Sequence, residues 1–282
     1  MPSMTWTAPA KVNLYLKVLG RRVDGFHDLE SLMVPLSLAD HLHFEKADAF
    51  ELCCDSPGVP TDQSNLVSKA VRIFQRVTGK DCHWRIRLEK NVPHGAGLGG
   101  GSSDAATALL ALNELEQAGL SEEKLASMAA EIGSDIPFFI YRKICKIEGR
   151  GEVVRPVHED EVPGLLGTKI LLLKPSFGVS TPDAYKHCMT ATELPDVDYA
   201  PTPMPWGSMI NDLERPVFRK YLFLAELKMW LRKQPEVETS MMSGSGSTMM
   251  AILADASQSD AVIRRAREEL DPTLWAQLVN IC

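Results

Sequence analysis

The segment at residues 91–106 reads NVPHGAGLGGGSSDAA and holds five glycines within seven residues. It lies between an alternating stretch at 82–89, which predicts a strand, and an alanine-rich run, which predicts a helix. The free N–H groups and the positive dipole end of such a helix face whatever the loop encloses. Because glycine lacks a Cβ atom, the loop backbone also approaches a ligand closely. The segment therefore favours a phosphate site, and a flexible surface loop is the alternative.

We call residues 93–103 the glycine loop. Its members, all candidate contacts to a nucleotide, are Pro93, His94, Gly95, Ala96, Gly97, Leu98, Gly99, Gly100, Gly101, Ser102 and Ser103. The two serine hydroxyls fall at the predicted helix start, where they suit a phosphate oxygen or a magnesium ion.

Several classes of phosphate-binding protein fit this loop poorly. The Walker A pattern is absent, and so are the H-R-D and D-F-G sets of protein kinases. Gly95, Gly97 and Gly100 formally satisfy G-x-G-x-x-G, but a dinucleotide fold needs a strand directly after the first helix. Here SEEKLASMAAEIG at 121–133 predicts a second helix instead. A dinucleotide-binding module is therefore the weaker alternative.

Hydrophobic periodicity outlines an α+β chain. Alternation predicts strands at 11–18 and 41–45, and helical spacing predicts helices at 65–79 and 103–119, the second closed by Gly119. The character of the sequence breaks near 159–167. We therefore expect an N-terminal part at 1–160 and a C-terminal part at 161–282, the latter ending in strand, helix and strand.

Composition excludes some partners. The chain has 282 residues and a formal net charge of −7, which argues against binding to nucleic acid, because that requires a broad basic face. Its six cysteines form no C-x-x-C pair, which predicts reduced thiols and a cytoplasmic location. We find no signal peptide and no apolar run long enough for a membrane helix, so we expect a soluble, unprocessed protein. Whether it is a monomer or a homodimer stays open.

Three segments in order carry a family resemblance. PAKVNLYL at 9–16, the glycine loop and MSGSGSTMMAI at 242–252 resemble the first, second and third motifs of the GHMP small-molecule kinases. RRVDGFHDLESL at 21–32 and GSDIPFF at 133–139 resemble a member of that family whose substrate carries cytidine. The resemblance implies a two-lobed α+β fold, with an N-terminal lobe like domain 2 of ribosomal protein S5 and a ferredoxin-like C-terminal lobe. It also implies ATP with Mg²⁺ as cofactors and a small alcohol as substrate. Another GHMP kinase, acting on a different alcohol, is the alternative within the family.

The resemblance also implies catalytic residues. Phosphoryl transfer needs positioning, charge neutralisation and an acceptor for the proton of the nucleophile. Asp135 matches the catalytic aspartate of the family, and Lys11 matches the lysine that keeps it ionised and stabilises developing charge. Without the resemblance, Asp135 reads as a turn residue and Lys11 as a solvated strand residue. Whether Asp135 is a true base or an electrostatic anchor stays open.

Other matched positions imply binding roles. Phe26, His27 and Tyr185 match residues that recognise cytosine, two by stacking and the histidine by hydrogen bonds. The further matched substrate contacts are Asn13, Thr181, Gly244 and Ser245. Asn65 matches a position near the adenine, and it is equally suited to cap the helix that begins after it. Ser103 is the candidate magnesium ligand, because no carboxylate clearly takes that place.

Overall fold

A computed structural model of the protein describes residues 4–282. Contacts divide the chain into two compact units. Unit 1 contains Leu38–Pro93 and Gly99–Lys143 with the described residues up to Lys11, and unit 2 contains Val12–Ser37, His94–Leu98 and Ile144–Cys282. The glycine loop thus contributes residues to both units. The division at residue 160 that the sequence suggests stays a prediction.

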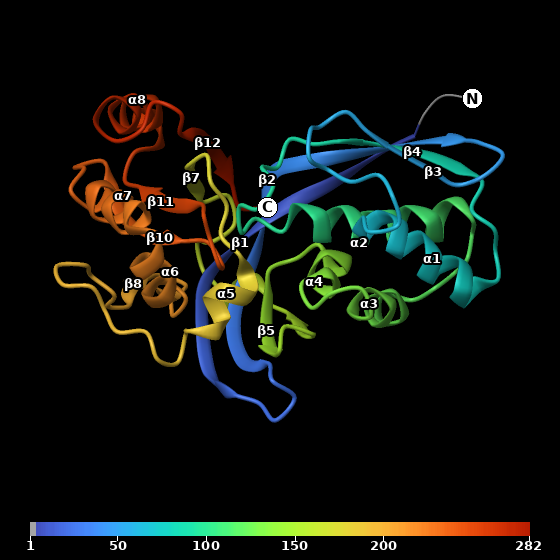
Figure 1. The fold of residues 1–282 in the computed structure, drawn as a ribbon, viewed down its shortest axis with the longest axis horizontal. Coiled ribbons are helices and arrows are strands. Elements are labelled where there is room, and N and C mark those ends of the chain that lie inside the picture. The colour runs from blue at the N-terminus through green and yellow to red at the C-terminus, as the bar shows by residue number, and fades with distance from the viewer. Residues whose placement is uncertain (1–3) are drawn as a thin grey trace. The chain divides into compact units, whose positions relative to one another are not determined.

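Unit 1 combines strands with four helices. Its complete elements are β3 (Glu51–Cys54), α1 (Leu66–Thr78), β4 (Trp84–Glu89), α2 (Gly100–Leu115), α3 (Glu122–Ala130) and α4 (Ile136–Tyr141), and it also holds parts of β1 (Met4–Arg21) and β2 (His27–Lys46). β4 pairs antiparallel with β2 and parallel with β3. Trp84, Ile86 and Leu88 are buried while the residues between them are exposed, as alternation along a half-buried strand requires. The four helices lie together on one side of these strands (Figure 1).

The predicted helices of unit 1 are confirmed with one correction. The helix predicted at 103–119 begins earlier, at Gly100, and ends at Leu115 rather than at Gly119. The chain leaves the helix because Gln117 takes a φ of 47° and the Ala118 N–H bonds to the carbonyl of Asn113. The side chain of Asn113 then accepts from the Leu120 N–H at 2.9 Å, which fixes the turn into α3.

Unit 2 contains two groups of strands and four helices. Its complete elements are β5 (Cys145–Gly149), β6 (Val153–Pro156), β7 (Lys169–Lys174), α5 (Thr181–Lys186), β8 (Thr202–Met204), β9 (Gly207–Asn211), α6 (Glu214–Lys220), α7 (Leu222–Arg232), β10 (Val237–Met242), β11 (Met249–Leu253), α8 (Ser259–Glu269) and β12 (Trp275–Asn280). Four strands form an antiparallel sheet in the order β10-β11-β7-β12. Helices precede β10 and β12, so the sheet has the β-α-β-β-α-β connectivity of a ferredoxin-like fold. That expectation is confirmed.

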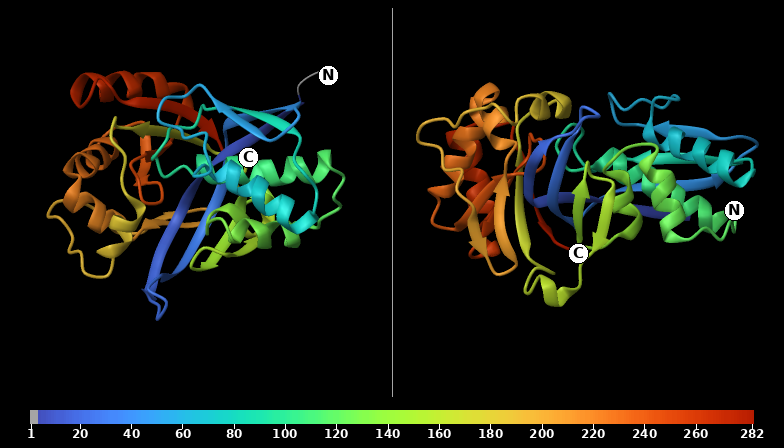
Figure 2. Two further views of the ribbon diagram at one scale, coloured as in Figure 1. Left: turned by 45° about the vertical axis from the view of Figure 1, so that its right-hand side comes forward. Right: turned by 90° about the horizontal axis from the view of Figure 1, so that it is seen from below.

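The remaining strands of unit 2 include the ends of β1 and β2 that a short turn joins (Figure 2). β1 pairs parallel with β9, and β2 pairs antiparallel with β5. The proline-rich segment at 195–207 contains the short strand β8, which pairs with β9. Within residues 4–282, we find no helix with the length and apolar character needed to span a membrane.

Candidate active site

Both predicted catalytic residues lie in unit 1. Lys11 lies on β1 and is 4% exposed, and Asp135 is the residue before the first turn of α4. Burial lowers the pKa of Lys11 below its usual value, and the Asp135 carboxylate acts in the opposite direction. Asp135 makes no capping hydrogen bond with its side chain, although the position before a helix is the usual place for one. A buried cation and a carboxylate not used as a cap therefore interact in this unit.

The backbone of the glycine loop packs against Lys11 and against the helix that Asp135 precedes. Gly99 has a φ of 71°, and a Cβ atom there would lie 2.7 Å from Cζ of Phe139 and 3.0 Å from Cγ of Lys11. Phe139 belongs to α4, the helix that Asp135 precedes. A side chain at position 99 would therefore displace the lysine stem, so glycine is required here for the packing of Lys11 as well as for the backbone conformation.

The first turn of α2 follows directly. Gly99 precedes the helix and offers no side chain to cap it, which leaves the first N–H groups of the turn without an intrahelical acceptor. Ser103 is fully buried, and its hydroxyl has no hydrogen-bond partner among residues 4–282. A helix start with uncapped N–H groups and an unsatisfied hydroxyl suits an oxyanion.

An ion-paired cluster that the sequence did not indicate supports the same turn. Lys90 forms ion pairs with Asp40 and, at 2.7 Å, with Asp104 of α2. The other oxygen of Asp40 accepts from the backbone N–H groups of Asn91 and Val92, just before the glycine loop. Burial raises the pKa of Asp104 to about 7, although Lys90 acts to lower it. The only sequence signal was an aspartate inside an alanine-rich run.

Asn65 has a structural role in unit 1. Its Oδ1 accepts from the Val67 N–H at 2.8 Å, and its Nδ2 donates to the carbonyl of Pro60 at 2.6 Å. The helix cap that the sequence allowed is thus present. The contact with adenine stays a prediction.

In unit 2, the part of the glycine loop at 94–98 packs against the third motif. We call residues 242–248 the third-motif loop. The Thr248 N–H donates to the carbonyl of Ala96, and the Ser243 hydroxyl donates to the carbonyl of Gly97. A Cβ atom at Gly97 would lie 2.4 Å from the carbonyl oxygen of Ser243. Two sequence motifs that are far apart in the chain are therefore in direct backbone contact.

Two polar residues missed by the sequence reasoning hold the third-motif loop. Asn211, at the end of β9, donates through Nδ2 to the carbonyls of Met242 and Gly244 at 2.8 and 2.7 Å. Glu214 accepts from the Met242 N–H and pairs with Lys228 at 2.6 Å. Burial raises the pKa of Glu214 above its usual value, and Lys228 partly offsets this rise. Both residues lie in NDLE, a segment with no motif-like signal.

We expect Asn211→Ala to destabilise the third-motif loop. The change leaves two buried carbonyls without their donor, which costs about 1–3 kcal/mol of unfolding free energy. Urea denaturation measures this loss. Asn280→Ala is the matched control, because Asn280 is exposed and we expect a change within about 0.5 kcal/mol. Overlapping denaturation curves for the two variants would remove Asn211 from this role.

The structure brings two of the predicted base-recognition residues together. The rings of His27 and Tyr185 are stacked, with centroids 5.9 Å apart and planes inclined by 26°. Phe26 lies next to His27 in the chain, but the residue is 51% exposed and its ring centroid lies 5.2 Å from the guanidinium carbon of Arg150. The histidine rather than the phenylalanine therefore stacks on Tyr185 in this structure, and an exposed ring remains at Phe26.

The other predicted substrate contacts also lie in unit 2. Asn13 is buried and donates to the Ser31 hydroxyl at 2.8 Å, which in turn donates to the carbonyl of Tyr15. Thr181 of α5 and Ser245 of the third-motif loop share a hydrogen bond of 2.8 Å. Ser31 was not predicted, yet it fixes the orientation of the Asn13 amide. Gly244 is positioned by Asn211, as described above.

A metal site made by the protein alone is not evident. Among residues 4–282, no group of three histidine, cysteine, aspartate or glutamate side chains is arranged to hold a metal ion. The six cysteines, all within the described part of the chain, are free thiols, as the sequence predicted.

Comparisons with known proteins define the class. The family model described as "GHMP kinases N terminal domain" matches residues 65–143, and the model described as "GHMP kinases C terminal" matches residues 201–271. The chain belongs to the GHMP kinase family.

Within this family, the chain is similar to kinases that share one name. The chain is 41% identical over 283 residues to the 4-diphosphocytidyl-2-C-methyl-D-erythritol kinase of Methylacidiphilum infernorum, with 97% of this chain and 95% of the relative covered. It is 43% identical over 253 residues to the kinase of the same name from Protochlamydia amoebophila, with 89% and 85% covered. A crystal structure of 4-(cytidine 5'-diphospho)-2C-methyl-D-erythritol kinase matches with a TM-score of 0.77 and 33% identity, covering 98% of this chain and 99% of that one.

Proposed function

We propose that the protein is an ATP-dependent kinase that phosphorylates the C2 hydroxyl of 4-diphosphocytidyl-2-C-methyl-D-erythritol, giving the 2-phosphate and ADP. The reaction belongs to the non-mevalonate (MEP) route to isoprenoid precursors. The observation that carries the chemistry is the pair formed by buried Lys11 and Asp135, with the Gly99 backbone packed on the lysine stem. The choice of substrate is supported by the identity to the relatives named above.

In this proposal Asp135 accepts the proton of the substrate hydroxyl, and Lys11 stabilises the negative charge that develops. A carboxylate that is not used as a helix cap is available for this task. Lys11 is buried, so its charge acts in a medium of low dielectric constant, where it is more effective than in water. The two side chains orient the substrate hydroxyl and neutralise developing charge. Phosphoryl transfer depends mainly on positioning and electrostatic stabilisation of this kind.

The nucleotide phosphates are proposed to bind at the glycine loop. The uncapped first turn of α2 supplies N–H donors, and the unsatisfied Ser103 hydroxyl fits a phosphate oxygen or a metal ion held by the phosphates. When bound there, Mg²⁺ would supply positive charge that neutralises the phosphates. Among residues 4–282, no group of three acidic, histidine or cysteine side chains is arranged to hold a metal ion, so Ser103 is the residue of this chain that we propose would hold Mg²⁺ together with the nucleotide.

The cytosine is proposed to bind at the His27, Tyr185 and Phe26 rings. The stacked pair gives a flat surface, and the exposed Phe26 ring gives a second one. Base stacking contributes about 1–3 kcal/mol per base with little selectivity, so the selectivity for cytosine would come from hydrogen bonds of the His27 ring. Asn13 and the hydrogen-bonded Thr181 and Ser245 are proposed to contact the polar remainder of the substrate.

A direct assay tests this proposal. The protein is incubated with Mg²⁺, ATP and 4-diphosphocytidyl-2-C-methyl-D-erythritol, and ³¹P NMR follows ADP and a new phosphate monoester on C2. We expect kcat/KM to exceed the values for mevalonate and homoserine by about 10⁴-fold, because hydrogen bonds built for one substrate are left unpaired with another. Turnover of mevalonate or homoserine alone would contradict the proposed substrate but would still support a kinase activity.

Three finer points stay predictions: a cytoplasmic location, a monomer or homodimer, and Ser103 as a magnesium ligand. Removal of Mg²⁺ with a chelator is the simplest check on the metal requirement.

A further inference from the structure

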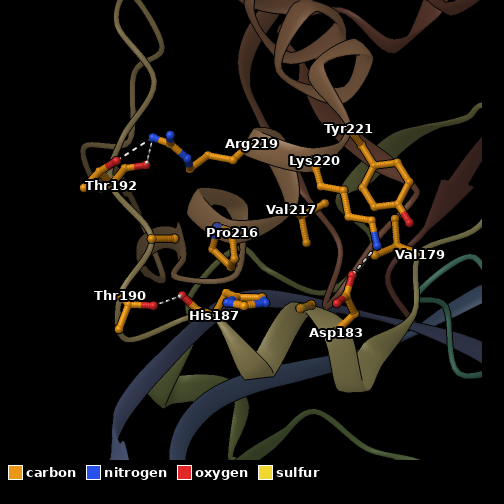
Figure 3. Close-up of a pocket in the computed structure, with 12 residues that line it drawn as sticks. Val179, Asp183, His187, Thr190, Thr192, Pro216, Val217, Arg219, Lys220 and Tyr221 are labelled. Atoms are coloured by element: carbon orange, nitrogen blue, oxygen red, sulfur yellow. Dashed lines mark hydrogen bonds and ion pairs between the residues drawn. The ribbon is translucent and has the colours of Figure 1, made fainter.

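Unit 2 contains a pocket to which neither the sequence nor the proposed function assigns a role. It has a volume of about 650 Å³ and lies between α5, α6 and the segment at 187–192 (Figure 3). We call it the α5–α6 pocket. This volume falls within the range of about 300–1,000 Å³ that small-molecule sites occupy.

The α5–α6 pocket combines an apolar wall with a basic rim. The apolar wall includes Val179, Pro216 and Val217. Arg219 and Lys220 form the basic rim. His187 lies across from Pro216 (Figure 3). Asp183 is the single acidic residue of the lining. The lining therefore carries a surplus of positive charge in a chain whose net charge is −7.

The two cations at the rim differ in their partners. Lys220 pairs with Asp183 at 2.5 Å, and side-chain exposures of 57% and 33% show that water reaches the pair. Arg219 donates to the side chain and carbonyl of Thr192, both neutral groups. Among residues 4–282, Arg219 has no carboxylate partner. A guanidinium offers five donors in a planar fork, so most of its capacity for a phosphate is left.

The α5–α6 pocket is separate from the proposed substrate contacts in unit 2. Asp183 and His187 face the pocket, whereas Thr181 and Tyr185 contact Ser245 and His27. Residues two positions apart on a helix point in nearly opposite directions, while residues four apart share a face. The short helix α5 therefore presents one face to the pocket and the other to the substrate residues.

We propose that the α5–α6 pocket is a second binding site, for a small phosphate ester with a short hydrocarbon body. Arg219 holds the phosphate, and Val179, Pro216 and Val217 cover the hydrocarbon. Lys220 extends toward the other end of the pocket and stays paired with Asp183 (Figure 3). A phosphate alone uses only the rim, and an alcohol alone uses only the wall.

Methyl NMR of the full chain, labelled on valine and alanine, tests the site. The probes are monobutyl phosphate, inorganic phosphate and 1-butanol, each titrated against saturating non-hydrolysable ATP analogue so that the glycine loop is occupied. We expect saturable shifts at Val179, Val217, Ala184 and Ala191 with monobutyl phosphate. We expect binding at least tenfold weaker for each of the other two probes.

Variants locate the phosphate contact. We expect Arg219→Ala to weaken monobutyl phosphate binding by at least tenfold, which corresponds to about 1.4 kcal/mol. Arg264→Ala is the matched control, because Arg264 is an exposed arginine of the same unit on α8. Equal binding by Arg219→Ala and the control would overturn the proposal. Shifts confined to residues outside the pocket would overturn it as well.

Discussion

Replacing Asp135 with asparagine is expected to lower kcat by about 10²–10⁴-fold while the protein still binds ATP. The amide has the shape of the carboxylate but neither accepts a proton nor carries charge. Loss of the carboxylate also removes the group that raises the pKa of Lys11, leaving burial to lower it without opposition. Both effects act on the transition state, so kcat falls more than the affinity for ATP.

Three measurements separate this loss from misfolding. Single-turnover kinetics give the rate of the chemical step, calorimetry gives ATP affinity, and thermal unfolding reports stability. Asp81→Asn is the matched control, since Asp81 is an exposed aspartate of the same unit. A near-wild-type kcat in Asp135→Asn would remove Asp135 from its catalytic role. A variant that folds, binds ATP and turns over slowly supports it.

The elements around the site were predictable because their signals are local. Alternating residues predicted β4, and helical spacing predicted α1 and α3, with Asn65 as the candidate cap of α1. The end of α2 was not predictable in this way. Gly119 looked like a helix terminator, but the side chain of Asn113 bonds to Leu120 and closes the turn earlier. A competing side-chain contact overrode the glycine signal.

The supporting residues could not be predicted, because their partners are distant in the chain. Asp40 and Lys90 are 50 positions apart, and Asn211 acts on carbonyls more than 30 positions away. In sequence, each is a single polar residue beside apolar ones. The same limit applies to His27 and Tyr185, which the resemblance named but whose stacking only the fold reveals. The α5–α6 pocket had no sequence signal at all.

The glycine loop illustrates how one pattern serves two physical needs. Its glycines predict a backbone that can approach a ligand closely. The first turn of α2, which has no side-chain cap, agrees with this prediction. At Gly97 the space is instead taken by the backbone of the third-motif loop, with a Cβ position 2.4 Å from the Ser243 oxygen and 2.8 Å from the Gly246 oxygen. Glycine at this position is therefore explained by packing within the protein.

Gly97→Ala is accordingly expected to lower the unfolding free energy strongly. The φ of 75° costs a residue with a side chain about 1–2 kcal/mol. The methyl group meets two backbone carbonyls that cannot rotate away, and such overpacking costs about 1–3 kcal/mol more. We expect kcat/KM to fall too, since the third-motif loop carries Gly244 and Ser245.

The matched control is Gly20→Ala, because Gly20 has an ordinary φ and open space around its Cβ position. We expect that variant to lie within about 0.5 kcal/mol of the parent in urea denaturation. If Gly97→Ala unfolded at the same urea concentration as Gly20→Ala, the contact between the two motifs would contribute little to stability. A loss of kcat/KM without a loss of stability would instead indicate that glycine is needed at position 97 for nucleotide binding. The relative size of the two losses therefore decides whether this glycine serves packing or nucleotide binding.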